Sequence, residues 1–164
     1  MDKMSLVTLL FLALPEGMLS FSIGLILMNV KPVLKKVLIF GFCFVITAFI
    51  VRSLPMMPGI HSILIVVLCS FYVVPIFRIS YLKAFSAAVL AFIFVVLGES
   101  LFLPHIHRIA ELTFEETMVD DRLRLLVTLP QQLFLALVAF ISYRLRGFHR
   151  DSSFQKQTYQ TWGD

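Results

Sequence analysis

The stretch SLVTLLFLALPEGMLSFSIGLILMNV, residues 5–30, decides the fold class of this chain. A helix needs about 20 mostly apolar residues to cross a bilayer, and this stretch exceeds that length. Its single charged residue, Glu16, lies between two helix-breaking residues, Pro15 and Gly17. We therefore predict a membrane-spanning helix in which the Pro-Glu-Gly step marks a polar site.

A secretory signal peptide is the alternative for this N-terminal stretch, because Lys3 precedes the apolar run. The run continues well past the 7 to 15 residues of an ordinary signal-peptide core, and no small-x-small cleavage site precedes Lys31. We therefore expect the stretch to be a retained span.

The composition of the whole chain agrees with a membrane protein. Of its 164 residues, 59% are hydrophobic and only 15% are charged, and the mean hydropathy is +0.93. Soluble domains have nearer a quarter of charged residues. Cys43 and Cys69 lie in apolar runs, which indicates small core residues rather than a disulfide. The formal net charge is +4, but the basic residues lie beside apolar runs, so we expect no nucleic-acid partner.

Five apolar stretches are long enough to span a bilayer. The predicted fold class is an all-α integral membrane protein, a bundle of five transmembrane helices within residues 1–143, followed by a short polar tail, residues 144–164. The predicted spans are residues 5–30, 33–51, 60–77, 82–103 and 125–143. The connection at residues 104–124 is the longest and carries five of the ten acids.

The distribution of Lys and Arg predicts the orientation, because cytoplasmic loops of membrane proteins are rich in both. Nine of the fourteen basic residues fall in the first loop, the third loop and the tail: Lys31, Lys35, Lys36, Arg78, Lys83, Arg144, Arg146, Arg150 and Lys156. We therefore expect the N-terminus to lie outside and the C-terminus in the cytoplasm. Such an orientation requires an odd number of spans.

Several polar residues are expected at a similar depth, toward the outer side of the bundle. Ionisable groups inside a bilayer cost about 2.5 to 3.5 kcal/mol, so they normally face a protein partner or a water-filled cavity. The candidates for a ligand site or polar cluster are Glu16, Arg52, His61, Glu99, Gln131 and Gln132.

Three roles remain open for Glu16 and Glu99. Either carboxylate could pair with Arg52 and lock the bundle, bind a ligand or signal, or take part in a protonation relay. Pro15 and Pro130 predict that the first and last spans are kinked or locally opened in their outer halves. An opened helix would free backbone groups for a ligand.

Metal binding and catalysis have weaker support in the sequence. His105 and His107 are weak metal candidates, because on an extended segment after Pro104 they could share a face. They are equally explained as interfacial or pH-responsive histidines. No nucleophile elbow, phosphate-binding loop, dinucleotide fingerprint or zinc-protease motif is present. We therefore expect no cofactor, no metal and no enzymatic activity.

The segment LTFEETMVDDRLRLL, residues 112–126, can form an amphipathic helix on the outer surface. Thr113 and Glu116 have the spacing of a capping box. The segment could cover a pocket or simply rest on the membrane.

The order of short motifs resembles a known family. LPEG in the first span is followed by KPVLKK, RSLP, GIHSILIVVL, GES in the fourth span and TLPQQ opening the fifth. This order is similar to the five-helix membrane-sensor region of Firmicute GHKL-type sensor histidine kinases, over residues 1 to about 150. The resemblance implies a sensor in the bacterial cytoplasmic (inner) membrane. The sequence given has no kinase domain, so we expect either a stand-alone relative or the sensor part alone.

Three functions follow as hypotheses. The first is a membrane sensor or regulatory subunit that passes an outer or intramembrane signal to a kinase or another membrane subunit, with the lipid bilayer as its surroundings. The second is a small-molecule binding or transport subunit, and such subunits usually have six spans. The third is a structural assembly partner of another membrane protein. A homo-oligomer is possible under each.

Overall fold

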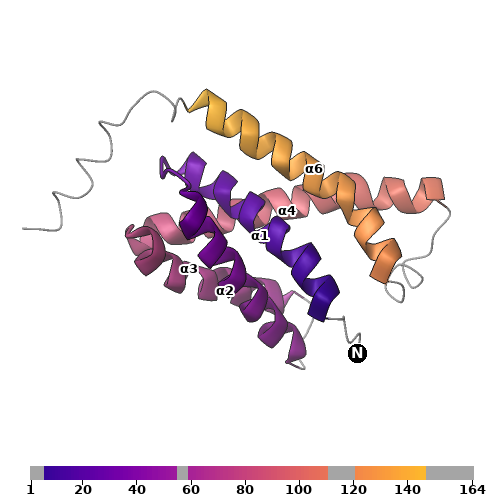
Figure 1. The fold of residues 1–164 in the computed structure, drawn as a ribbon, viewed down its shortest axis with the longest axis horizontal. Coiled ribbons are helices and arrows are strands. Elements are labelled where there is room, and N and C mark those ends of the chain that lie inside the picture. The colour runs from indigo at the N-terminus through magenta and orange to yellow at the C-terminus, as the bar shows by residue number, and fades with distance from the viewer. Residues whose placement is uncertain (1–5, 55–58, 111–120, 147–164) are drawn as a thin grey trace, which may run out of the picture.

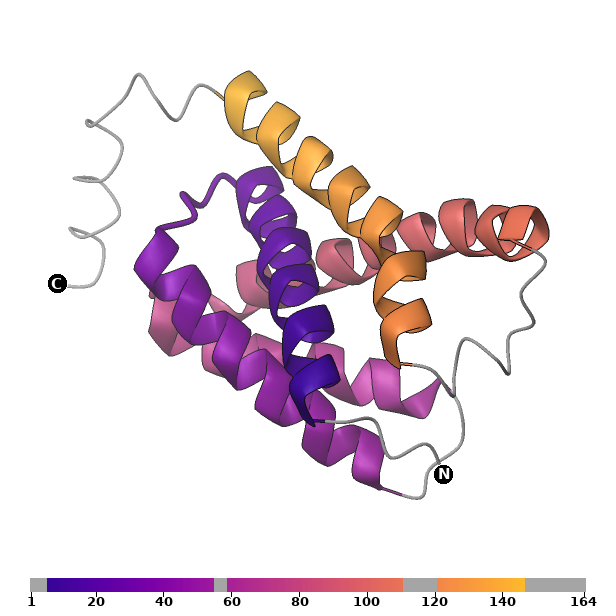
Figure 2. The ribbon, with the colours of Figure 1, turned by 45° about the vertical axis from the view of Figure 1, so that its right-hand side comes forward.

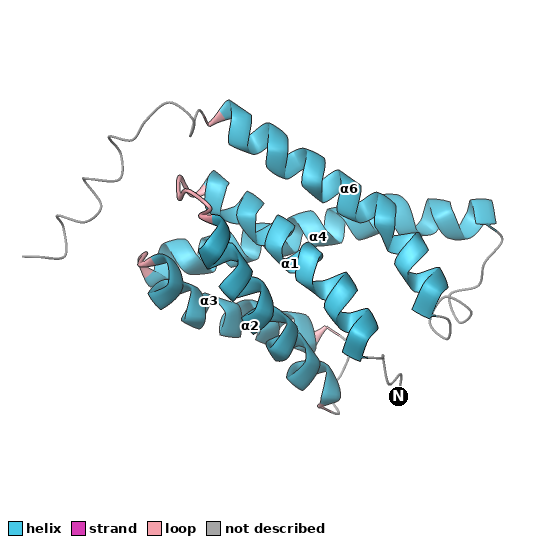
Figure 3. Ribbon diagram, viewed as in Figure 1, coloured by secondary structure: helices cyan, strands magenta, loops and turns pink. Residues whose placement is uncertain are grey.

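The computed structural model describes residues 6–54, 59–110 and 121–146, and these residues are helical apart from short turns (Figure 3). The helices are α1 (Leu6–Leu27), α2 (Leu34–Ser53), α3 (Ile60–Phe77), α4 (Tyr81–Ala110) and α6 (Asp121–Leu145). All five are long and apolar enough to cross a membrane. The predictions of an all-helical fold and of five helices that could each span a membrane are therefore confirmed for the described part of the chain.

The helix α1 is the centre of the bundle. It packs against α2, α4 and α6, whereas α3 packs against α2 and α4 on the far side (Figures 1 and 2). Half of the α1 span is buried inside the protein, compared with a third or less of each other span. The first span is thus enclosed by protein, and the outer faces of the other four carry the large exposed apolar side chains that a bilayer would cover.

Consecutive helices run in opposite directions, so the connections lie at two ends (Figure 1). One end holds the α1–α2 and α3–α4 connections and the C-terminal end of α6. We call it the basic end, because it carries Lys31, Lys35, Lys36, Arg78, Lys83, Arg144 and Arg146. The other end, where α2 and α4 finish and α3 and α6 begin, is called the opposite end.

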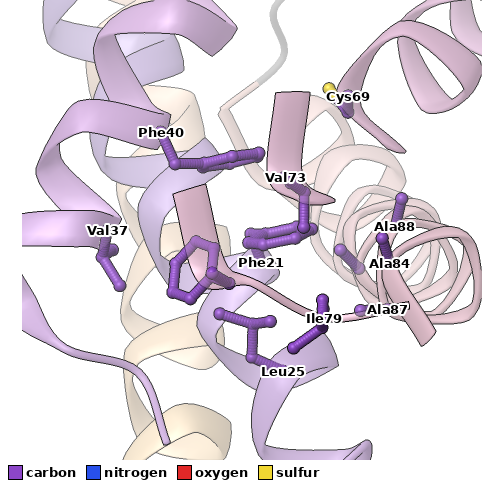
Figure 4. Packing of buried hydrophobic residues seen from close by; sticks show 12 residues of the cluster. Phe21, Leu25, Val37, Phe40, Cys69, Val73, Ile79, Ala84, Ala87 and Ala88 are labelled. Atoms are coloured by element: carbon purple, nitrogen blue, oxygen red, sulfur yellow. The ribbon is translucent and has the colours of Figure 1, made fainter. Parts of the chain in front are cut away.

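The main hydrophobic core fills the half of the bundle nearest the basic end (Figure 4). Phe21 and Phe40 stack with ring centroids 4.0 Å apart, and Phe77 lies 6.0 Å from Phe21. Four alanines of α4 complete the cluster, and they allow α1 to approach closely. At Gly24 a Cβ atom would lie 2.1 Å from the carbonyl oxygen of Ala87, so only glycine fits there. Small residues at helix contacts are typical of membrane bundles.

Two helix ends at the basic end close through left-handed residues. Asn29 has φ 59°, and the amides of Asn29 and Val30 bond to the carbonyls of Ile26 and Leu25. This pair of bonds is a Schellman motif, which satisfies carbonyls that the end of α1 would otherwise leave unpaired. Arg78, with φ 54°, ends α3 with a single bond to the Val74 carbonyl. Both ends thus turn sharply without glycine.

The helices continue through their prolines. Pro15, Pro75, Pro104 and Pro130 all lie inside α-helices. The expectation of a locally opened helix at Pro15 and Pro130 is therefore wrong, while a kink stays a prediction. Each proline removes one backbone bond, but unwinding would expose several polar groups to an apolar environment.

The predicted bounds of the long connection, residues 104–124, are also wrong at both ends. The helix α4 continues past Pro104 to Ala110, and α6 already begins at Asp121. The extended segment expected for His105 and His107 is accordingly helical. Most of the predicted amphipathic segment, and all of the tail beyond Arg146, lie outside the described residues.

Candidate functional site

A cavity of about 140 Å³ lies between the first four helices, on the opposite-end side of the core. Its described lining residues all come from α1, α2, α3 and α4: Glu16, Gly17, Ser20, Phe21, Phe40, Phe44, Arg52, Ser62, Ile65, Val66, Cys69, Ala88, Ala91, Phe92, Val95 and Glu99. Phe21, Phe40 and Cys69 also belong to the core cluster shown in Figure 4. They form the floor of the cavity, which is therefore apolar.

Glycine makes the upper part of the cavity possible. At Gly17 a Cβ atom would lie 2.5 Å from Cδ1 of Phe44, so the ring occupies the space of the missing side chain. At Gly41 a Cβ atom would lie 2.8 Å from Cγ of Met18 in the same interface. The Gly17 position, expected from the sequence to interrupt the helix, thus serves instead to pack α1 against α2.

Three of the predicted site residues line this one cavity: Glu16, Arg52 and Glu99. Arg52 lies in the last turn of α2, and its charge acts on both carboxylates, while the charge of Glu99 also acts on Glu16. Arg52 and Glu99 are exposed, which places them at the mouth of the cavity, and Glu16 is partly covered. Two acids and one base from three helices therefore face a common space.

Glu16 also connects the cavity to α6. Its Oε1 atom accepts a hydrogen bond from Nε2 of Gln131 at 3.5 Å, the outer limit for such a bond. Gln131 is only 4% exposed, and Gly98 of α4 makes room for it, since a Cβ atom there would lie 3.0 Å from Cγ of Gln131. This buried amide is held between α1 and α4.

Gln132, the next residue, holds α6 against α1 through the backbone. Its Nε2 atom donates to the carbonyl oxygen of Leu12 at 3.4 Å. The neighbouring carbonyl, that of Phe11, is the one that loses its helical donor to Pro15. The sequence Pro-Gln-Gln in α6 therefore packs beside the proline step of α1, and both amides serve the interface between these two helices.

His61 has a different place. Its ring Nε2 atom lies 3.2 Å from the carbonyl oxygen of Leu54, across the connection between α2 and α3. It is not one of the residues that line the cavity, although its neighbour Ser62 is. His61 therefore closes a turn near the mouth.

The metal candidates do not form a common face. The backbone of His105 and His107 lies within α4, so the extended segment that a shared face would require is not present there. Among the residues that the structure describes, no group of three or more His, Cys, Asp or Glu lies together as a metal site would require. The side chain of His107 and the acids at positions 111 and 115 lie outside the described residues.

The aromatic and thiol lining was not foreseen from the sequence. Cys69 reaches the floor of the cavity, and its Sγ atom lies 2.9 Å from the hydroxyl oxygen of Tyr72. Phe44 and Phe92 line the walls. The sequence of α1 did contain one indication of a close helix contact, because Gly17, Ser20 and Gly24 follow the three-to-four spacing of a small-residue helix face.

The ends of α1 and α6 are joined at the basic end. The guanidinium of Arg146 donates to the side-chain oxygen of Asn29 and, through Nη2 at 3.1 Å, to the carbonyl oxygen of Leu27. A charged donor near the last carbonyls of a helix is favourable, because these carbonyls lack helical partners. The two helices are therefore linked both beside the cavity and at the basic end.

No family model matches this sequence, and no curated protein or solved structure matches it either. The geometry of the cavity and of its contacts therefore carries the functional argument.

Proposed function

We propose that this chain is a membrane sensor or regulatory subunit whose helical bundle binds a small molecule and passes the event to a partner through α6. One observation carries the proposal. The Glu16 carboxylate lines the cavity and, at the same time, accepts a hydrogen bond from Gln131 of α6. A ligand that engages Glu16 therefore competes with the contact that positions α6.

The energies involved suit a switch. A hydrogen bond of this kind contributes about 0.5 to 1.5 kcal/mol net, and more when one partner is charged. Coupling between two sites in regulated proteins is typically about 1 to 3 kcal/mol. The long Gln131–Glu16 bond is thus strong enough to bias α6 and weak enough for a ligand to break.

The output of the proposed sensor is the basic end. The helix α6 runs from the level of the cavity to Arg146, which contacts the end of α1, and the polar tail follows. The clustering of Lys and Arg at this end supports a cytoplasmic location for it, with the N-terminus outside. A kinase or another membrane subunit in the bacterial inner membrane would receive the signal there. The order of motifs, which resembles that of sensor-kinase membrane regions, suggests the same function.

The proposal can be tested by measuring whether α6 moves when the cavity is filled. Spin labels on Leu145→Cys and Leu82→Cys, at exposed positions of α6 and α4, report on the basic end in a Cys43→Ser, Cys69→Ser background. The full chain in lipid nanodiscs would be exposed to three small amphiphiles, each with a phenyl ring on a short chain: 2-phenylethylamine, 2-phenylethanol and 3-phenylpropionate. We expect the amphiphile that binds to change the distance between the labels.

A matched pair of labels on Leu34→Cys and Leu82→Cys, on α2 and α4, serves as the control and should keep its distance. If an amphiphile binds and the label on α6 does not move, the sensor function is wrong. If no amphiphile of the three binds, the ligand-binding step is wrong.

A further inference from the structure

We propose that the cavity between α1, α2, α3 and α4 takes a small organic monocation with an apolar body about the size of a benzene ring. This inference names the ligand class for the proposed function and rests on it. It follows from three features of the cavity: its charge, the separation of its polar and apolar parts, and its size.

The charge of the lining favours a cation. Glu16 and Glu99 contribute two carboxylates, and Arg52 contributes the single guanidinium among the described lining residues. Arg52 interacts with both acids, so it can balance only one of the two charges. An uncompensated carboxylate in an apolar environment is costly, and the cost is removed when a cation binds beside it. One positive charge on the occupant balances the site.

The polar and apolar parts lie at different depths. Along α1, Glu16 precedes Phe21 by about 7.5 Å, at 1.5 Å of rise for each residue. Along α4, Glu99 lies about 12 Å beyond Ala91, toward the opposite end, by the same rise. Glu99 is therefore at the mouth of the cavity and Glu16 at its middle depth, while Phe21, Phe40 and Cys69 form the floor. A bound molecule would place its charged group near the acids and its apolar body below them.

The size and chemistry of the lower part suit a ring or a short alkyl group. The cavity measures about 140 Å³, close to the roughly 150 Å³ of an apolar protein cavity that holds benzene. Phe21, Phe40, Phe44 and Phe92 are among its lining residues. The faces of phenylalanine rings also attract cations, which adds to the preference for a positive group over a neutral one. An anion would meet two carboxylates against the single guanidinium of Arg52.

The test compares the affinities of the three probes for the full chain in lipid nanodiscs, read from the rise in melting temperature with concentration. All three probes carry a phenyl ring on a short chain, but they end in an ammonium, a hydroxyl or a carboxylate. We expect 2-phenylethylamine to bind at least about tenfold more tightly than 2-phenylethanol, and 3-phenylpropionate to bind most weakly. In a Glu16→Gln, Glu99→Gln variant the preference for the amine should fall to about twofold or less.

Two further variants make the result specific. Glu99→Gln alone, at the exposed mouth, is used if the double variant does not fold, and it should reduce the preference part of the way. Ser22→Ala is the matched control, because Ser22 bonds to the Met18 carbonyl and is not a cavity-lining residue, so it should leave the preference unchanged. In a Cys43→Ser variant, saturating amine should also slow alkylation of Cys69 by N-ethylmaleimide.

The proposal is overturned if the alcohol or the carboxylate binds more tightly than the amine. It is overturned equally if none of the probes raises the melting temperature, or if the amine preference survives in the glutamine variants. Tight binding of 3-phenylpropionate that moves the α6 label would defeat the charge inference and leave the sensor function standing. Binding of the amine without movement of the label would contradict the sensor function and leave the charge inference standing.

Discussion

At the scale of single residues, Glu16 is unusual because it serves two partners. One of its carboxylate oxygens meets Gln131, and the same side chain lines a cavity that also holds Glu99 and Arg52. A carboxylate that only locked the bundle would have no open space beside it. The presence of a cavity at this position favours the binding role among the three that the sequence left open.

Gln131 should transmit the state of the cavity rather than create it. In a Gln131→Leu variant, which keeps the volume but loses the amide, we expect amphiphile affinity to stay within about fivefold of the wild type, because one hydrogen bond is worth about 1 kcal/mol. The movement of the Leu145→Cys label should be reduced, because the bond that the ligand displaces is absent while Arg146 still joins α6 to α1. The measurement is the same label distance with and without bound amphiphile.

Gln132→Leu is the control for this prediction, because Gln132 contacts the Leu12 carbonyl and not the cavity acids. Its label should still move on binding. Undiminished movement of the label in the Gln131→Leu variant would show that α6 responds without this contact.

At the scale of elements, the contact between α1 and α4 depends on one glycine. A methyl group on Gly24 would lie 2.1 Å from the backbone oxygen of Ala87, and backbone atoms cannot turn aside as a side chain can. The α4 face opposite consists of Ala84, Ala87, Ala88 and Ala91, all buried. The two helices approach until their backbones touch, so this pair holds the bundle in register.

Gly24→Ala should therefore destabilise the bundle more than Gly41→Ala does. At Gly41 the added methyl group would meet the flexible Met18 side chain at 2.8 Å, which can move. We expect a loss of about 3 kcal/mol at Gly24, at the upper end for overpacking, and about 1 kcal/mol at Gly41. Unfolding in sodium dodecyl sulfate, monitored by circular dichroism, measures both. Equal losses would mean that α1 and α4 are not fixed by this contact.

The positions of the helices were easier to predict from the sequence than the contacts between them. Five apolar stretches of sufficient length allowed five spans to be placed, and the depth of Glu16 and Glu99 followed from their positions within them. The sequence could not tell which way each helix is rotated, because this depends on packing such as Gly24 against Ala87. The apolar floor of Phe21, Phe40 and Cys69 was missed for the same reason. The helical path through Pro104 was missed because a proline usually indicates a helix end.

At the scale of the whole molecule, the two ends of the bundle differ in charge. The basic end holds seven described Lys and Arg residues, at the turns after α1 and α3 and at the end of α6. At the opposite end the described basic side chains include Arg52, which faces two acids, and Arg108. This asymmetry predicts which end remains in the cytoplasm.

The orientation can be measured with single cysteines in a Cys43→Ser, Cys69→Ser background. In intact cells, a membrane-impermeant maleimide should label Ile60→Cys, at the opposite end, and should label Leu34→Cys, at the basic end, only after permeabilisation. Both positions are exposed. The reverse pattern would contradict the predicted orientation. A cytoplasmic N-terminus would also favour the transport subunit over the sensor.

The backbone contact at Gly24 and Ala87 has a mechanical consequence, because a rigid point inside a pair of helices acts as a fulcrum. Measured along α1 at 1.5 Å per residue, Glu16 is about 12 Å from this point on one side, and Asn29 is about 7.5 Å away on the other. If α1 and α4 spread apart at the mouth of the cavity, their ends at the basic end would thus move toward each other. This second movement would be little more than half as large as the first. Arg146 ties α6 to the shorter arm. A filled cavity would therefore draw the helices together at the basic end, so the labels on Leu145→Cys and Leu82→Cys should approach each other.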